Sequence, residues 1–118
     1  MLHTNLQHEH RIYLAGKSDA SFERVCATLE QALELKPFDH DSEDSSVYAR
    51  SVGAGFDFNI TRTEDADTIA TWMASARRGV NYQVILSYYG SLDEAALQRV
   101  LSALQQALKT ELEVYHVV

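Results

Sequence analysis

Carboxylates are the side chains of this chain whose number and placement are most unusual. Between Pro37 and Asp67 there are eight acidic and two basic residues, whereas the rest of the chain has nine acidic and eight basic residues. Seven of these acids form two groups, which are Asp39, Asp41, Glu43 and Asp44, and then Glu64, Asp65 and Asp67. Gathered carboxylates repel one another, which destabilises a folded protein. They can also attract a basic partner and speed its association.

Two other interpretations of these acids stay open. In the first, they belong to a solvated loop, and Glu64, Asp65 and Asp67 stabilise the first turn of a helix through its dipole. In the second, they bind a divalent metal, because the first group has acids at alternating positions, as an EF-hand loop does. The match fails where that loop needs Gly and then Glu, since Asp44 and Arg50 stand there. We therefore predict no metal ligand in this stretch.

Histidines are the second candidates for metal binding. His8 and His10 lie two residues apart in a predicted strand, so both rings point to the same side. A third ligand would have to be His3 or His116, and no motif of fixed spacing supports such a site. We expect His8 and His10 to be partly exposed strand residues.

Nucleophiles and phosphate-binding loops give no catalytic motif. Gly16, Lys17 and Ser18 stand between a strand and a helix, as in a phosphate loop, but Arg11 occupies the position of the first glycine, so the backbone cannot cradle a phosphate. Cys26 falls on the apolar side of a helix, where a thiol is inert. No Ser-His-Asp or Cys-His group can be nominated from spacing. We predict that the protein is not an enzyme and has no cofactor.

Tyrosine and arginine side chains are candidates for a protein interface. These residue types anchor many interfaces. If helices cover only one face of the sheet, the other face presents Tyr13, Tyr48, Tyr89 and Tyr115, together with Arg11 and Arg50. In the alternative arrangement, a helix covers this face and the tyrosines are ordinary half-buried sheet residues.

A β-hairpin over residues 46–63 positions the two acidic groups. Gly53 and Ala54 suit a two-residue type II′ turn, because glycine accepts a positive φ at the first turn position. Alternation then separates an apolar face from a polar one. The apolar face has Val47, Ala49, Ser51, Phe56, Phe58 and Ile60, and the polar face has Tyr48, Arg50, Asp57, Asn59 and Thr61. The acidic groups should therefore emerge side by side at the open end of the hairpin.

Hydrophobic periodicity predicts the remaining elements. They are, in order, a strand over 8–15, a helix from Ser18 or Asp19 to Pro37, a loop over 38–45, the hairpin, a helix from 63 or 65 to Gly79, a central strand over 80–89, a helix opened by a capping box at Ser91–Glu94, and a strand over 111–118. This order predicts an α+β fold with a ferredoxin-like βαββαβ core and an added αβ unit. We expect one domain, 1–118, with one mostly antiparallel five-stranded sheet and helices packed on it.

Composition excludes several classes of protein. The net charge of −7 argues against binding to nucleic acid phosphates. A single cysteine excludes an internal disulfide and a cysteine-based zinc site, and it favours a reducing, cytoplasmic compartment. No apolar segment has the length of a signal sequence core or of a membrane span.

These features favour a small acidic cytoplasmic protein that binds a basic protein. An inhibitor or immunity-type protein that blocks a basic nuclease toxin is the most economical example, because a nuclease must be cationic where it holds phosphate. The predicted contact residues are Asp39, Asp41, Glu43, Asp44, Tyr48, Arg50, Glu64, Asp65 and Asp67. The alternative is a ferredoxin-like sensor or regulatory domain that binds a small molecule or metal as a homodimer through its open sheet face.

Overall fold

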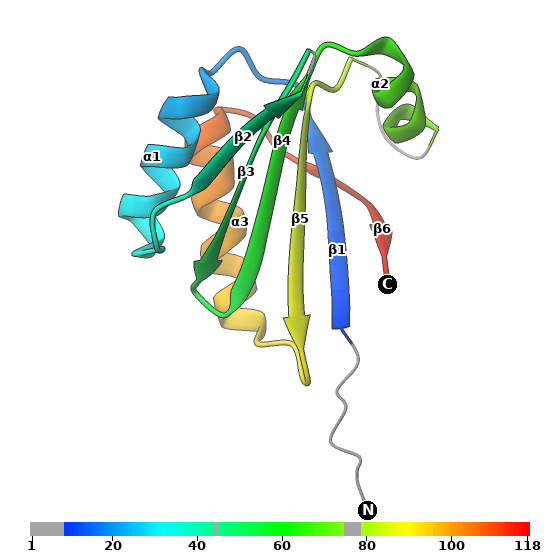
Figure 1. Ribbon diagram of the computed structural model, residues 1–118. Helices are drawn as coiled ribbons and strands as arrows, with labels where there is room; N and C mark the ends of the chain where they lie inside the picture. Colours follow the sequence, from blue (N-terminus) through cyan, green and yellow to red (C-terminus); the bar gives the residue numbers. More distant parts are fainter. Residues whose placement is uncertain (1–8, 44, 75–78) are drawn as a thin grey trace, which may run out of the picture.

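A curved antiparallel sheet forms the centre of the computed structural model, which describes residues 9–43, 45–74 and 79–118. The elements follow one another as β1 (Glu9–Gly16), α1 (Phe22–Leu33), β2 (Asp39–Glu43), β3 (Ser46–Gly53), β4 (Phe56–Thr63), α2 (Ala66–Met73), β5 (Tyr82–Tyr89), α3 (Glu94–Leu108) and β6 (Glu113–Val117). Within these residues the sheet has six strands in the order β2-β3-β4-β5-β1-β6, so β2 and β6 are its edges (Figure 1).

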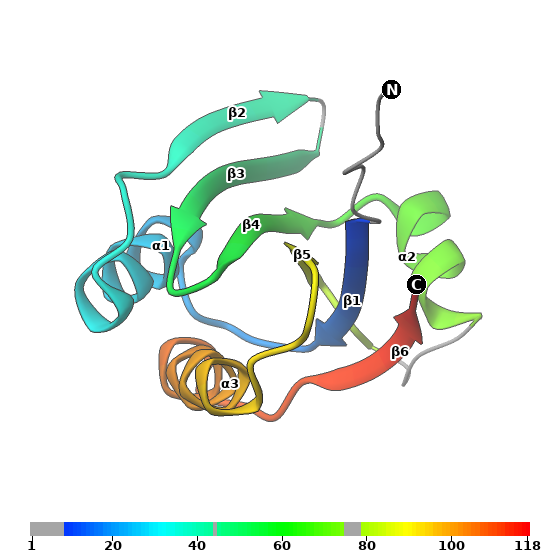
Figure 2. The same cartoon turned by 90° about the horizontal axis from the view of Figure 1, so that it is seen from below.

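Two helices cover one face of the sheet, which we call the helix face. α1 and α3 lie side by side there. On the opposite face, which we call the open face, α2 lies near β1 (Figure 2). Trp72 of α2 is buried with Ala15 and Val80, and Tyr115 packs against this small cluster. Among the described residues, no helix lies over the open face of β2, β3 and β4 (Figure 2).

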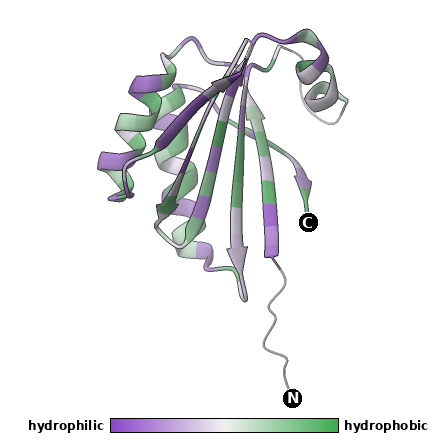
Figure 3. Cartoon of the chain, viewed as in Figure 1, coloured by the Kyte–Doolittle hydropathy of each residue, from purple (hydrophilic) through white to green (hydrophobic). Residues whose placement is uncertain are grey.

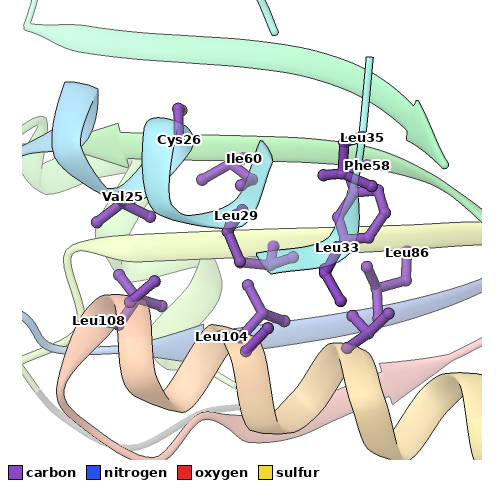
Figure 4. Close-up of a cluster of buried hydrophobic side chains, with 14 of the residues drawn as sticks. Val25, Cys26, Leu29, Leu33, Leu35, Phe58, Ile60, Leu86, Leu104 and Leu108 are labelled. Carbon is purple, nitrogen blue, oxygen red and sulfur yellow. The ribbon is translucent and has the colours of Figure 1, made fainter. Parts of the chain in front are cut away.

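The core lies between the helix face and the two helices. Leu29 of α1, Leu104 of α3 and Phe58 of β4 meet there (Figure 4). Along each central strand, apolar residues alternate with more polar ones, as a half-buried sheet requires (Figure 3). β5 lies third from one edge and fourth from the other, which confirms the prediction that it is central.

The hairpin has the predicted faces, but its turn is one residue further along. Ala54 and Gly55 have φ values of 54° and 92°, and Gly53 pairs with Phe56. These signs are those of a type I′ turn, not the type II′ turn expected at Gly53. Moving a turn by one residue changes the register by two, so every side chain keeps its face. Gly53 stays in the strand, where an added Cβ would lie 2.8 Å from Cδ2 of Leu35.

Ala54→Asn should stabilise the protein by about 0.5–1 kcal/mol, because asparagine tolerates the left-handed conformation that alanine adopts there with strain. Chemical denaturation followed by circular dichroism measures the change. Ala54→Val is the matched control, and it should lower the free energy of unfolding because β-branched residues tolerate positive φ poorly. Equal stability of the two variants would contradict the turn assignment.

The number and order of the strands differ from the prediction. The sheet has six strands, not five, because 39–43 forms β2 and not a loop. The ferredoxin-like core is not confirmed, since such a core needs β1 between β4 and β5, whereas β5 lies beside β4. α2 has eight residues and spans about 12 Å, while an eight-residue strand spans about 27 Å. α2 is therefore too short to carry the chain back to the start of β4. β5 begins near the end of β4 and runs antiparallel to β4.

Two helices begin later than predicted. Ser21, not Ser18 or Asp19, caps α1, because its hydroxyl accepts a hydrogen bond from the Arg24 amide at 3.2 Å. Asp93, not Ser91, caps α3 through the amide of Ala96 at 3.1 Å. In both cases the prediction placed the cap two or three residues too early.

Candidate functional site

β2 is an acidic strand at the edge of the sheet. All five of its residues are exposed, and the strand is hydrophilic along its length (Figure 3). His40 pairs with Ala49, whose side chain is buried on the helix face, so His40 and Ser42 share that face. Asp39, Asp41 and Glu43 consequently lie on the open face, with successive Cα atoms about 7 Å apart. We call these three residues the acidic edge.

Tyr48 and Arg50 of β3 lie next to the acidic edge. Arg50 pairs with Asp39, and Tyr48 pairs with Asp41. Burial raises the pKa of the Tyr48 hydroxyl, and the negative charges of Asp41 and Glu43 and a hydrogen bond to Asp41 raise it further. Tyr48 therefore keeps its proton over the physiological range and can donate a hydrogen bond beside the carboxylates.

Only part of the second acidic group approaches the first. The Glu64 amide donates a hydrogen bond of 3.4 Å to the carbonyl of Ser45, so the segments after β2 and β4 lie side by side. The Glu64 carboxylate is 3.8 Å from the guanidinium of Arg62. The predicted contact residue Asp44 lies outside the described residues.

The other two acids of the second group belong to α2. Asp65 is the N-cap, and its carboxylate accepts hydrogen bonds from the amides of Asp67 and Thr68 at 2.9 and 3.5 Å. Asp67 is exposed in the first helical turn. Since α2 packs toward β1, on the far side of β4 from β2, these two carboxylates stabilise the helix end and do not extend the acidic edge.

Two hydroxyl groups that sequence reasoning missed fix the open end of the hairpin. Thr63 is fully buried, and its Oγ1 lies 2.6 Å from Oγ of Ser46 and accepts a hydrogen bond from the Asp65 amide at 3.0 Å. The Thr63 amide donates to the carbonyl of Asn81 at 3.0 Å. The sequence pattern does not predict the burial and hydrogen bonds of Thr63, because Thr63 simply continues the alternation of β4. Its burial depends on which segments of the chain meet at this end of the hairpin.

The tyrosines expected on the open face have different surroundings. Tyr89 is exposed, and its hydroxyl is 3.3 Å from the Glu9 carboxylate. Tyr13 is half-buried, with its ring 5.9 Å from that of Tyr115, which packs against the α2 cluster. Arg11 donates a hydrogen bond to Glu9 at 2.7 Å. Of these candidates, Tyr48 and Arg50 are the ones that adjoin the acidic edge.

The remaining chemical candidates have structural roles. Ser18 is buried, and its hydroxyl donates a 2.5 Å hydrogen bond to the carbonyl of Leu108, which ties the loop before α1 to the end of α3. A cavity of about 410 Å³ lies beside it, flanked by Lys17 and Lys109. Cys26 is buried, and burial raises the pKa of its thiol to about 12. The thiol is therefore protonated and unreactive at neutral pH.

The described residues contain no group of three or more His, Cys, Asp or Glu side chains placed to hold a metal ion. His10 stacks on Tyr88 with ring centres 5.1 Å apart, and His116 packs against Tyr13. His3 and His8 lie outside the described residues.

None of the helices in the described ranges combines the length and the apolar character that crossing a lipid bilayer requires. Comparisons with protein-family models, with curated protein sequences and with solved structures give no match for this chain.

Proposed function

We propose that the protein is a small, non-catalytic binding module that recognises a basic protein through the acidic edge. Asp39, Asp41 and Glu43 make the main charge contacts, and Tyr48 and Arg50 provide a hydrogen-bond donor and a flat cation beside them. The observation that carries the proposal is that all five residues of β2 are exposed at an edge of the sheet. Three carboxylates on one side of one strand lie close enough to bind neighbouring basic side chains together.

Charge distribution supports a basic partner over a neutral one. The stretch from Pro37 to Asp67 holds most of the excess negative charge of the chain. Glu64 lies at the same end of the sheet as Glu43, since Ser45 and Glu64 share a backbone hydrogen bond. Asp65 and Asp67 would add to the long-range attraction of a cation without contacting it, and Asp44 stays a predicted contact residue outside the described part of the chain.

A cationic nuclease toxin is the partner class that best suits this surface, with the protein as its inhibitor or immunity protein. Such an enzyme must hold a row of phosphates with lysine and arginine, and a row of carboxylates can occupy the same groove. The free cysteine is compatible with a reducing cytoplasm as the place of action.

Neutralising the acidic edge should weaken capture of the basic partner by at least about ten-fold. The variant is Asp39→Asn, Asp41→Asn, Glu43→Gln, and the assay is low-salt retention of proteins from the native source on the immobilised chain, followed by inhibition of nuclease activity in the eluate. The matched control is Glu23→Gln, Glu94→Gln, Glu111→Gln, which changes the net charge equally at three exposed positions outside β2. The control should retain the partner.

Two results would contradict the proposal. One is that no basic protein is retained at low salt, and the other is that both triple variants retain the partner equally. Circular dichroism should show the same thermal transition for the three proteins, since all six residues are exposed and none lies in the core.

The alternative function, a dimeric sensor of a small molecule or metal, rested on the ferredoxin-like core and its open sheet face. The observed strand order gives that analogy no support. We therefore put the binding module first.

A further inference from the structure

The outer side of β2 is a regular strand edge. Within the described residues β2 pairs with β3 alone, and its register runs without a bulge from Asp39 opposite Arg50 to Glu43 opposite Ser46. β6, at the other edge of the sheet, has a register shift opposite Tyr13 and Leu14, and such irregularities oppose further pairing. β2 is consequently the edge whose geometry suits an additional strand (Figure 2).

Two hydrogen bonds identify the backbone groups on this outer side. The Ser42 amide donates to Oδ1 of Asp41 at 2.8 Å, and the Phe38 amide donates to Oε2 of Glu30 at 2.7 Å. Amides in an antiparallel edge strand point alternately toward the neighbouring strand and away from it. The Ser42 and Phe38 amides bond side chains and not the backbone of β3, so both point away from β3. His40 lies two residues from each of them, so its amide points outward as well.

Pairing of β2 with β2 of a second copy is unfavourable. In an antiparallel pair, the carboxylates of one copy would stand opposite those of the other on the open face, and like charges directly opposite one another destabilise a sheet. The same three carboxylates favour a strand that carries lysine or arginine at alternating positions. The charge of this edge therefore favours a basic partner strand over β2 of a second copy of the chain.

We propose that an extended basic segment of the partner adds to the sheet along β2 as a further strand. The inference rests on the proposed function and specifies how the partner is held. The basic residues of the segment lie on the open face beside Asp39, Asp41 and Glu43. Its intervening residues lie on the helix face beside His40. The centre of the His40 ring is 5.9 Å from that of Phe22 and 6.5 Å from that of Phe38. Small or β-branched residues fit beside this ring.

A peptide tests strand addition directly. The probe is an acetylated and amidated heptapeptide that alternates lysine with valine, and fluorescence anisotropy measures its binding to the full chain. His40→Pro should weaken binding at least about ten-fold, because proline removes the outward amide and leaves all charges of the acidic edge in place. His40→Thr keeps the amide and loses the same ring contacts, so it should bind within about two-fold of the unchanged protein.

Methylated peptides provide a second measurement that does not depend on the folding of a proline variant. One peptide has methyl groups on the backbone nitrogens of its valines, and the other on those of its lysines. Strand addition predicts that one of the two loses binding and the other keeps it, because only alternate amides face β2. Loss with one methylated peptide and with His40→Pro supports the proposal.

The results that overturn strand addition differ from those that overturn the proposed function. If the parent peptide does not bind, or if both methylated peptides bind as it does, β2 accepts no strand. In either case a basic protein retained through the acidic edge would still support the binding module. If the neutralised triple variant retains that protein as well, the binding module fails independently of the peptide results.

Discussion

Replacing Phe58 by alanine is expected to lower the free energy of unfolding by about 3–5 kcal/mol, which is the usual cost of deleting a buried aromatic ring. Phe58 lies in the middle of β4 on the helix face and is 1% exposed. Its ring fills the space between the sheet and the two helices, close to Leu33 and Leu35 in Figure 4. The neighbouring strands hold their positions by backbone pairing on both sides, so the site cannot collapse fully around the cavity.

Urea denaturation followed by tryptophan fluorescence and circular dichroism measures this loss. Phe58→Leu keeps much of the volume and should cost less than half as much. Val52→Ala, at a position that is 40% exposed on the adjacent strand, should change the free energy by less than about 0.5 kcal/mol. Similar losses for Phe58→Ala and Val52→Ala would contradict the assignment of the helix face.

Raising the pH from 8 to 11 is expected to destabilise the protein by on the order of 4 kcal/mol, as a consequence of two buried acids. Burial raises the pKa of Cys26 to about 12, and the nearby Glu30 and Glu23 charges add to the shift. Burial also raises the pKa of Tyr82 to about 12, against the opposing effect of Arg62. In the unfolded chain these groups ionise near about 8.5 and about 10.

The sign of the effect follows from which state ionises first. Below about pH 8.5 both groups are protonated in the folded and the unfolded chain, so their ionisation does not lower the free energy of unfolding. Above that pH the unfolded chain loses protons that the folded chain keeps, and stability falls until the folded groups ionise near pH 12. The fall approaches about 1.4 kcal/mol for each pH unit and each group.

Chemical denaturation at intervals between pH 7 and 11 measures this dependence, and Cys26→Ala is the variant that isolates the thiol. The variant should be less stable at pH 7, because it loses buried volume, but its stability should fall less steeply between pH 8.5 and 10. Tyr82 also titrates in this range, but burial is the main cause of its raised pKa, and the variant keeps that burial. Parallel curves for the two proteins would show that the thiol does not contribute.

The elements that bury an apolar stripe were predicted from the sequence, whereas β2, which buries no side chain, was missed. α1, α3 and the hairpin follow from the spacing of residues such as Leu29, Leu104 and Phe58. β2 consists of charged and polar residues and is exposed on both sides, so no periodicity marks it. It is a strand because the free backbone of β3 can pair with it, and this is a tertiary effect that a local pattern does not contain.

The acids of the candidate site were identified, but their arrangement was not. The prediction placed seven carboxylates together at the open end of the hairpin. In the fold, Asp39 and Asp41 lie along β2 away from that end, and Asp65 caps a helix that packs toward β1. Recognising β2 as a strand would have separated the acids into those that line its open face and those that do not.

The order of the strands could not be obtained from the sequence. β5 is apolar enough to be central, and this was predicted, but either β1 or β5 could have paired with β4 on pattern alone. The short α2 decides between them, because it is too short to carry the chain back along the whole length of β4. The predicted end of this helix, just before Gly79, lies outside the described part of the chain. Trp72 is the buried residue of α2, because α2 packs on the open face and not on the helix face.

The position of β1 determines when the molecule can assemble during its synthesis. β1 is synthesised before the other described strands, yet the two strands that flank it, β5 and β6, are the last of them, and Arg11 exchanges two backbone hydrogen bonds with Val118. Until those strands emerge, only the β2, β3 and β4 meander can form. β1 therefore has no sheet partner until β5 and β6 have been synthesised, and the complete sheet is expected to form only after that point.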